Sequence, residues 1–244
     1  NMRNNILVHP CRKLNYRFMV AEWLWIYSGM NDLTSLAKIN PNMVAFSDDG
    51  ITLSGAYGIA LREQIDYILE ILAKQSDTRQ AVLTIWRPNP APSKDIPCTI
   101  SIQFLLRDNK LHLVVSMRSS DIWLGLPYDV FNFSMIGNII AAYLQVEPGM
   151  LQMNLGSSHL YEKDLSQALA VNNSFYNTVT LRSPQLSKAD IPRVGLIQSI
   201  VLQNTEFQEE KANLAEPFRT YYQVLTAEVS VQQAKSLLAN LNPL

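Results

Sequence analysis

The feature that most constrains the fold is a pair of strand-like runs separated by a short polar turn. Thr99–Leu106 and Lys110–Met117 are rich in β-branched and apolar side chains. The intervening RDNK segment at Arg107–Lys110 has the composition of a hairpin turn. A chain with this pattern must build an antiparallel pair, and the nearby run Ala81–Trp86 predicts a further strand.

Helical patterns surround these strands. Tyr16–Ser28 is apolar on nearly every face and is followed by Gly29, a common helix terminator. Leu61–Lys74 has apolar residues at helical spacing, which predicts an amphipathic helix. A third helix is expected over Val130–Gln145, with Asp129 as its N-cap residue.

The rest of the chain completes one predicted domain. Leu151–Leu155 is expected to form a strand, and Val229–Asn240 a last helix. The proline-bearing stretch Arg87–Pro97 lies between two strands and is too short to separate domains. These patterns predict a single α+β domain over residues 1–244, with a mixed sheet and helices packed on one side.

Composition excludes two classes of partner. The chain has 20 Lys and Arg against 21 Asp and Glu and no long basic stripe, so it is not expected to bind duplex nucleic acid. The apolar stretch Ile136–Val146 is too short to span a bilayer, so no membrane contact is expected. Cys11 and Cys98 are too few for a disulfide framework, which predicts a reducing, cytoplasmic compartment. No metal site is expected.

Cys98 is a candidate nucleophile. It follows a proline at the start of a predicted strand, although a lone cysteine is more often a small buried hydrophobic residue. The hairpin would bring Arg118 close to it. A guanidinium beside a thiol, whose free pKa is roughly 8.5, favours the reactive thiolate. The alternative for Arg118 is a surface salt bridge.

Other polar residues lie in apolar surroundings. Glu22 stands within FMVAEWLWIY, where a carboxylate is costly unless it is hydrogen-bonded or used. A buried acid with a raised pKa suits proton transfer, whereas a Glu at the helix rim needs no function. His159 and Tyr161, in GSSHLY, fit either a site or a satisfied core pair.

Taken together, these residues resemble the thymidylate synthase family. That family has a proline–cysteine nucleophile, then an Arg-Ser-x-Asp…Gly-Leu-Pro-Phe-Asn segment, then a His-x-Tyr motif. The order is unbroken from Arg12 to Leu165. The matching residues here are Cys98, Arg118–Asp121, Gly125–Asp129, and His159 with Tyr161, joined by Glu22, Tyr57–Gly58 and Asp77–Val82.

The resemblance implies a thymidylate synthase-like mixed sheet and a folate-dependent reaction at C5 of a pyrimidine nucleotide. The Cys98 thiolate would add to C6 of the base and make C5 nucleophilic. C5 would then take the one-carbon group of 5,10-methylenetetrahydrofolate.

The resemblance also implies binding roles. Arg118 and Ser119 would hold the nucleotide phosphate. Arg79 would reach the phosphate in the partner subunit of a homodimer, and His159 and Tyr161 would hold the sugar 3′-hydroxyl.

A further group would serve the folate side of the site. Asp121 and Gly125 would face the folate ring, together with Tyr128. Glu22 would organise protons through water.

Asp129 stands where the family has a base-reading Asn. An amide can donate to O4 of uracil and accept from N3–H, whereas an ionised carboxylate can only accept. A carboxylate suits the N4 amino group of cytosine instead. The resemblance therefore points to a cytidylate hydroxymethylase, with dCMP favoured, CMP possible and water quenching the exocyclic methylene.

Other departures concern the rest of the site. Gln80 replaces the second of the family's paired arginines, MVAFSDDG lacks the folate-packing tryptophans, and the ending NLNPL is unlike the family's apolar tail. The chain starts at Asn1 rather than Met, so we expect an incomplete N-terminus and a phosphate-binding Arg upstream of it.

Two alternatives stay open. The first is a C5-methyltransferase of the same fold, either a thymidylate synthase acting on dUMP or a dCMP methylase. The second is a non-catalytic relative that binds nucleotide or its own mRNA, although binding alone does not need the Cys98 thiol. In either case the expected location is the cytoplasm of a bacterium or of a phage-infected host.

Overall fold

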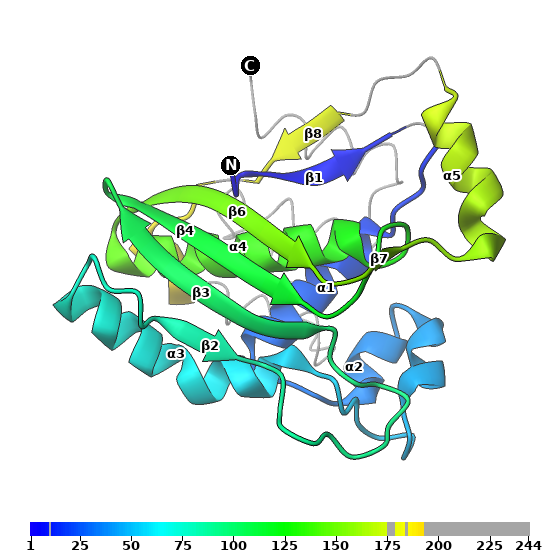
Figure 1. Cartoon of the computed structure of the whole chain (residues 1–244), viewed down its shortest axis with the longest axis horizontal. Helices are drawn as coiled ribbons and strands as arrows, with labels where there is room; N and C mark the ends of the chain where they lie inside the picture. Colours follow the sequence, from blue (N-terminus) through cyan, green and yellow to red (C-terminus); the bar gives the residue numbers. More distant parts are fainter. Residues whose placement is uncertain (10, 175–178, 184, 193–244) are drawn as a thin grey trace, which may run out of the picture.

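The computed structural model describes residues 1–9, 11–174, 179–183 and 185–192 (Figure 1). The helix predicted over Val229–Asn240 lies outside the described residues.

A four-stranded mixed sheet forms the centre of the molecule. Its order is β2 (Val82–Thr84), β3 (Thr99–Arg107), β4 (Lys110–Met117) and β6 (Glu147–Leu155). The first three strands are antiparallel, and β4 pairs with β6 in parallel. The expected mixed sheet is confirmed.

The predicted hairpin is the tightest element of this sheet. Arg107 of β3 pairs with Lys110 of β4, which leaves a two-residue loop. Asp108 and Asn109 both have positive φ, at 49° and 57°. Two consecutive left-handed residues match the twist of the flanking strands, and Asn and Asp tolerate this conformation best among non-glycine residues.

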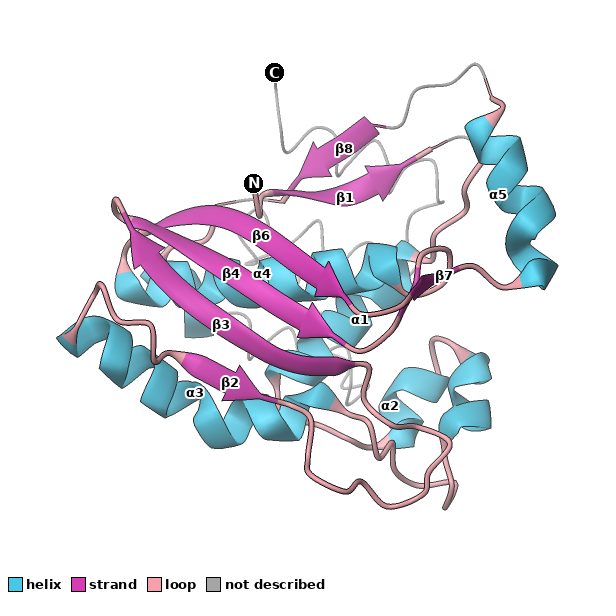
Figure 2. Cartoon of the chain, in the orientation of Figure 1, coloured by secondary structure: helices cyan, strands magenta, loops and turns pink. Residues whose placement is uncertain are grey.

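Helices pack against one face of the sheet. α1 (Tyr16–Tyr27) and α4 (Leu126–Leu144) lie behind the strands in Figure 2, and α3 (Tyr57–Lys74) contacts β2. Fully buried Phe131 and Phe133 of α4 and Leu113 of β4 belong to the core between these layers. The expected α+β arrangement is thereby confirmed.

Smaller elements complete the described chain. β1 (Asn4–Val8) pairs with β8 (Val179–Arg182) apart from the main sheet, and β5 (Ser120–Asp121) pairs with β7 (Ser158–His159). The short helices are α2 (Leu33–Ala37), η1 (Pro41–Phe46), η2 (Glu162–Asp164), α5 (Leu165–Asn172) and η3 (Lys188–Asp190). None of the described helices is long and apolar enough to cross a membrane.

The prediction of Asp129 as an N-cap is wrong. Helix α4 begins four residues before the expected Val130, with Gly125 as its N-cap, and Asp129 lies in the first turn. Pro127 explains the earlier start, because its fixed φ suits a first turn in which its missing N–H is not needed. Asp129 can therefore turn its side chain toward a site instead of closing the helix.

Helix α3 also begins earlier than predicted, at Tyr57 rather than Leu61. Gly58 explains the difference. A Cβ at this position would lie 2.8 Å from the carbonyl oxygen of Ile26 and 3.0 Å from the backbone nitrogen of Met30. Only glycine lets the first turn of α3 approach the end of α1 so closely.

Candidate functional site

A pocket of about 150 Å³ lies between α1, the first turns of α4 and the loop that enters β3. Cys98, Glu22 and Asp129, from three distant parts of the chain, all line it. The fold thus brings together three of the four residues predicted to be catalytic.

Cys98 is half-buried at the end of the loop before β3. Burial raises the pKa of its thiol; the Arg118 guanidinium lowers it, and the Asp129 and Asp95 carboxylates raise it. Arg118 therefore lowers the pKa of Cys98, as predicted, but burial of the thiol raises this pKa by more. The thiol needs a proton acceptor or a bound charge before it can attack.

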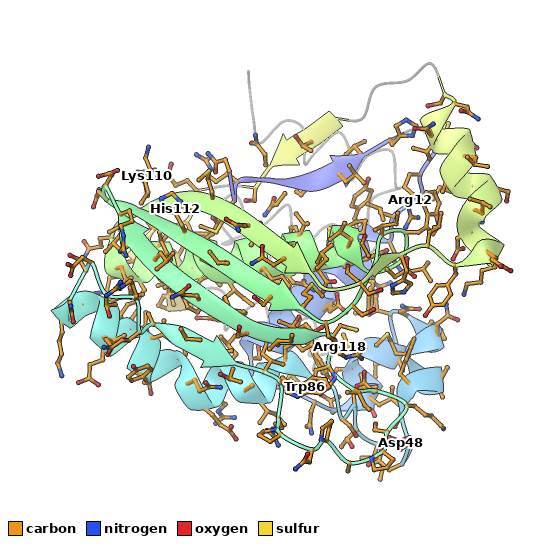
Figure 3. The ribbon with its side chains drawn as sticks, in the orientation of Figure 1. Arg12, Asp48, Trp86, Lys110, His112 and Arg118 are labelled. Carbon is orange, nitrogen blue, oxygen red and sulfur yellow. The ribbon has the colours of Figure 1, made fainter. Side chains whose placement is uncertain are left out.

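Arg118, the fourth predicted catalytic residue, holds the loop that carries Cys98. Its backbone N–H donates to the Cys98 carbonyl (2.9 Å), as expected from the hairpin. Its guanidinium donates to the carbonyls of Pro97 (3.1 Å) and Ile96 (2.9 Å). The guanidinium also lies over the Trp86 ring, 5.8 Å from its centroid (Figure 3). Among the described residues Arg118 contacts this loop and no carboxylate, which favours a role at the loop over a surface salt bridge.

Glu22 points into the pocket from α1. One carboxylate oxygen accepts a hydrogen bond from the side-chain amide of Asn132 on α4 (2.8 Å). Burial raises the pKa of Glu22 to about 7, and the Asn132 hydrogen bond opposes this rise. The predicted raised pKa is confirmed, and the rim alternative is wrong.

Asp129 faces the same space without a hydrogen-bond donor among the described residues. Burial raises the pKa of its carboxyl well above the usual range, and the negative charge of Glu22 raises it further. Two carboxyl groups in one small pocket resist double ionisation. The raised pKa favours the neutral form of Asp129 relative to a solvated carboxyl group.

A second cluster lies beside the β5–β7 pair. The Ser119 hydroxyl and Nδ1 of His159 are 3.4 Å apart, and the His159 and Tyr161 rings meet edge to face with centroids 5.1 Å apart. Tyr161 is 52% exposed, so the alternative of a buried core pair is wrong. These three side chains are free to meet a ligand.

Of the residues predicted for the folate side, Glu22 lines the pocket. Asp121, Gly125 and Tyr128 lie at or just before the start of α4, beside the pocket lining. One Asp121 carboxylate oxygen accepts from the backbone N–H of Trp123 (2.8 Å) and of Leu124 (3.0 Å). The Tyr128 hydroxyl accepts from the N–H of Asn15 (3.0 Å). A Cβ at Gly125 would lie 3.7 Å from the Asp129 carboxylate, which places this glycine against the pocket wall.

Arg79 does not reach this pocket. It is exposed just before β2, and none of the described residues gives its side chain a partner. Its carbonyl accepts from the Gln103 side chain (2.9 Å). Its proposed role across a subunit interface stays a prediction.

The sequence model of the thymidylate synthase family matches residues 1–209. The chain belongs to the thymidylate synthase family.

Similar proteins come from phages and bacteria. Deoxyuridylate hydroxymethyltransferase of Bacillus phage SP01 is 35% identical over 173 residues, covering 63% of this chain and 45% of the relative. The enzyme of the same name from Pseudomonas phage M6 is 30% identical over 179 residues, covering 69% and 51%. Thymidylate synthase 1 of Bacillus spizizenii is 29% identical over 168 residues, covering 63% and 60%. The chain thus spans about half the length of the two phage relatives.

The fold agrees with this membership. The crystal structure of thymidylate synthase from T4 phage superposes with a TM-score of 0.57 at 22% identity, covering 68% of this chain and 66% of that one. At this identity the likeness establishes the fold.

Two polar residues of the pocket, Asn132 and Asp95, were not among the predicted site residues of this thymidylate synthase family member. Asn132 follows Asp129 by three positions on the same helix face, and this spacing was the available signal. Asp95 lies in the loop before Cys98 and lines the pocket beside Gly55. Nothing in its local sequence distinguishes Asp95 from a solvated loop residue, so only the fold reveals it.

Arg12 is a further cation at the start of α4. Its guanidinium lies over the Trp123 ring, 4.1 Å from the centroid, and donates to the Trp123 carbonyl. Burial lowers the pKa of Arg12. Within the part of the chain that the structure describes, Arg12 is thus a partly buried positive charge near Asp121 and Tyr128 (Figure 3).

Proposed function

We propose that this protein hydroxymethylates C5 of a pyrimidine nucleotide, with dCMP the favoured substrate and CMP a possible one. The observation that carries the proposal is the shared pocket of Cys98, Glu22 and Asp129. A nucleophilic thiol, a proton-transfer acid and a base-reading carboxyl group are the three parts that this reaction needs.

Covalent attack begins the proposed reaction. The Cys98 thiolate adds to C6 of the pyrimidine, and the electron pair of the C5–C6 double bond makes C5 nucleophilic. Arg118 fixes the loop carbonyls at Ile96 and Pro97, which keeps the sulfur at one place in the pocket. Glu22, whose pKa is about 7, can take or give a proton near neutral pH.

Asp129 reads the base. Facing cytosine, its carbonyl oxygen accepts from the N4 amino group and its acid proton is shared with N3. A proton at N3 draws electrons from the ring and favours addition at C6. The missing hydrogen-bond partner of Asp129 within the described chain supports this role, because a buried acid needs one.

A second candidate substrate is dUMP. Two of the similar phage proteins are named deoxyuridylate hydroxymethyltransferases, which favours uracil. The raised pKa of Asp129 allows this reading, because the neutral acid can donate to O4 and accept from N3–H. Hydroxymethylation is common to both candidates, and the base is what separates them.

The pocket fits flat heterocyclic rings. Ile26, Leu36, Met43 and Leu53 supply an apolar wall, and the carboxyl groups with Asn132 supply the polar edge. The family's cofactor, 5,10-methylenetetrahydrofolate, supplies the one-carbon unit when bound. Asp121, Gly125, Tyr128 and Glu22 are the residues that we propose to hold it.

A homodimer completes the proposal. Among the described residues no helix covers the face of the sheet opposite α1 and α4 (Figure 2). Val82, Gln103, Val114 and Gln152 form a continuous row across the four strands. Met150 and Val82 are exposed apolar residues of these strands. A second copy placed on this face would bring in Arg79, which lies beside Gln103.

Mass spectrometry of the product tests the proposal. The protein is offered dCMP, CMP and dUMP with 5,10-methylenetetrahydrofolate, and each nucleotide is weighed. The expected result is a hydroxymethyl gain on dCMP. The same gain on dUMP alone would select the second candidate, a methyl gain would make the protein a C5-methyltransferase, and no gain on any nucleotide would favour the non-catalytic relative.

A further inference from the structure

A second pocket adjoins the first. It has a volume of about 400 Å³ and lies between the start of α3 and the proline-rich loop before β3. The two pockets share one wall, made of Leu53, Ala56, Asp95, Ile96 and Pro97. Asp95 is the one titratable residue that lines both pockets.

Asp95 is held firmly in this wall. Its carboxylate oxygen Oδ2 accepts from the Gly55 N–H at 2.7 Å. Its own N–H donates to the Ser93 hydroxyl at 3.0 Å. A Cβ at Gly55 would lie 2.7 Å from Oδ1 of Asp95, so glycine alone leaves room for the carboxylate. The Arg118 bonds to Ile96 and Pro97 fix the segment that links Asp95 to Cys98.

The other acids of the first pocket have different partners. Glu22 accepts from Asn132, and Asp129 stands beside Glu22 on the α4 side. Asp95 lies in the wall shared with the second pocket, three residues before the nucleophile, close enough that its charge raises the pKa of Cys98. A water molecule entering from the second pocket would meet Asp95 before it met the other two carboxyl groups.

We infer that Asp95 is the general base that activates the water which becomes the hydroxyl group of the product. This inference rests on the proposed hydroxymethylation and names the residue for its last step. The second pocket is the route by which that water arrives.

After one-carbon transfer, the nucleotide carries an exocyclic methylene at C5 and is bonded through C6 to the Cys98 sulfur. Asp95 takes one proton from water while the water oxygen bonds to the methylene carbon. The electrons of the exocyclic double bond move onto C5, then re-form the C5–C6 double bond as the Cys98 thiolate leaves. Asp95 then releases its proton to solvent.

The chemistry of Asp95 suits a base. Burial raises the pKa of its carboxyl, and the nearby Asp48 charge raises it too, whereas the Gly55 hydrogen bond lowers it. A carboxylate with a raised pKa is a stronger proton acceptor than a solvated one.

The test separates the two halves of the reaction with Asp95→Asn. The amide oxygen can still accept from Gly55, so the loop keeps its shape. In a single turnover, tritium release from C5 of labelled dCMP reports one-carbon attachment, and hydroxymethyl product reports water addition. We expect tritium release within about twofold of wild type and product formation reduced about 100-fold, within the range for loss of a general base.

Two further measurements sharpen the result. Added 2-mercaptoethanol should capture the stalled methylene in Asp95→Asn as a thioether of the nucleotide. Formate should restore product formation to Asp95→Ala, since it can replace the missing carboxylate. Asp66→Asn is the matched control, because Asp66 is an exposed acid of α3 that lines neither pocket.

The outcomes are distinct. Product formation that keeps pace with tritium release in Asp95→Asn would overturn the role of Asp95, as would equal loss of both. If wild-type protein releases no tritium from dCMP or dUMP in the presence of the folate, the proposed function itself fails.

Discussion

At the scale of single residues, Asp129 and Glu22 are two acids of the proposed active site. Burial raises the pKa of both acids, and the negative charge of Glu22 raises the pKa of Asp129 further. One neutral and one ionised carboxyl group can act as acid and base at the same pH. The same pair makes both base selection and stability sensitive to substitution.

The substitution Asp129→Asn should move the protein toward uracil. The amide donates to O4 and accepts from N3–H, but it cannot share an acid proton with N3 of cytosine. We expect the ratio of kcat/KM for dCMP to that for dUMP to fall by at least about tenfold, the cost of one mismatched hydrogen bond. Tyr143→Phe, near the far end of the same helix and away from the pocket lining, is the control. An unchanged ratio would remove Asp129 from base reading.

Glu22 should also weaken the fold as pH rises. Its pKa is about 7 in the folded protein against 4.5 for the unperturbed group, so the folded state holds a proton that the unfolded state has lost. The contribution of Glu22 to the free energy of unfolding is therefore fully present below pH 4.5. It is lost between pH 4.5 and about pH 7, by about 3 kcal/mol in total. Asp129 contributes in the same direction.

Urea unfolding of Glu22→Gln at pH 5 and pH 8 measures this effect. The variant should lose less stability than wild type between the two values, because Gln cannot ionise. A wild-type protein and variant with the same pH dependence would mean that Glu22 is solvated.

At the scale of helices and strands, the local sequence determines the hairpin turn, whereas tertiary packing and first-turn geometry determine where α3 and α4 begin. The β3–β4 hairpin is predictable from four consecutive residues, because Asp108 and Asn109 tolerate the positive φ angles that the turn requires. The first residues of α3 and α4 are not predictable in this way. Gly58 acts through the packing of α3 on α1, and Pro127 acts through the geometry of the first turn of α4. The local sequence alone left two possibilities each for Cys98 and Glu22, a functional role or a structural one. Only the resemblance to the family placed both residues in one predicted active site. Asp95 needed the fold itself.

Gly58→Ala should destabilise the packing of α3 on α1. The added methyl group meets backbone atoms of Ile26 and Met30 at 2.8 to 3.0 Å, and backbone cannot move aside cheaply. We expect a loss of about 1–3 kcal/mol in urea unfolding. Gly137→Ala is the contrast, because its methyl group meets the side-chain ends of Met2 and Leu113. Equal losses in the two variants would contradict this account of the α3 start.

At the scale of the whole molecule, the proposed homodimer would bring the open sheet face and exposed Arg79 into one interface. Val114→Lys places a charge in the centre of that face. The variant should elute as a monomer in size-exclusion chromatography. It should also lose activity, because Arg79 of a second copy would no longer reach the site. A dimer that persists would mean that subunits meet elsewhere.

Subunit mixing tests the shared site directly. Arg79→Ala and Cys98→Ser should each be inactive alone. Mixed after partial unfolding, they should regain about a quarter of wild-type activity, because half of the dimers carry one complete site. No recovery would place Arg79 outside the partner's site.

The proposed reaction depends on attack by Cys98 on C6 of a pyrimidine nucleotide, in the pocket that Cys98 shares with Glu22 and Asp129. Intact-mass spectrometry after incubation with 5-fluoro-dCMP and 5,10-methylenetetrahydrofolate tests it most directly, because fluorine at C5 cannot leave as a cation and stalls the covalent complex. We predict that wild-type protein gains the combined mass of nucleotide and folate and that Cys98→Ser gains none. No adduct with either 5-fluoro-dCMP or 5-fluoro-dUMP, or an equal adduct on Cys98→Ser, would contradict the account.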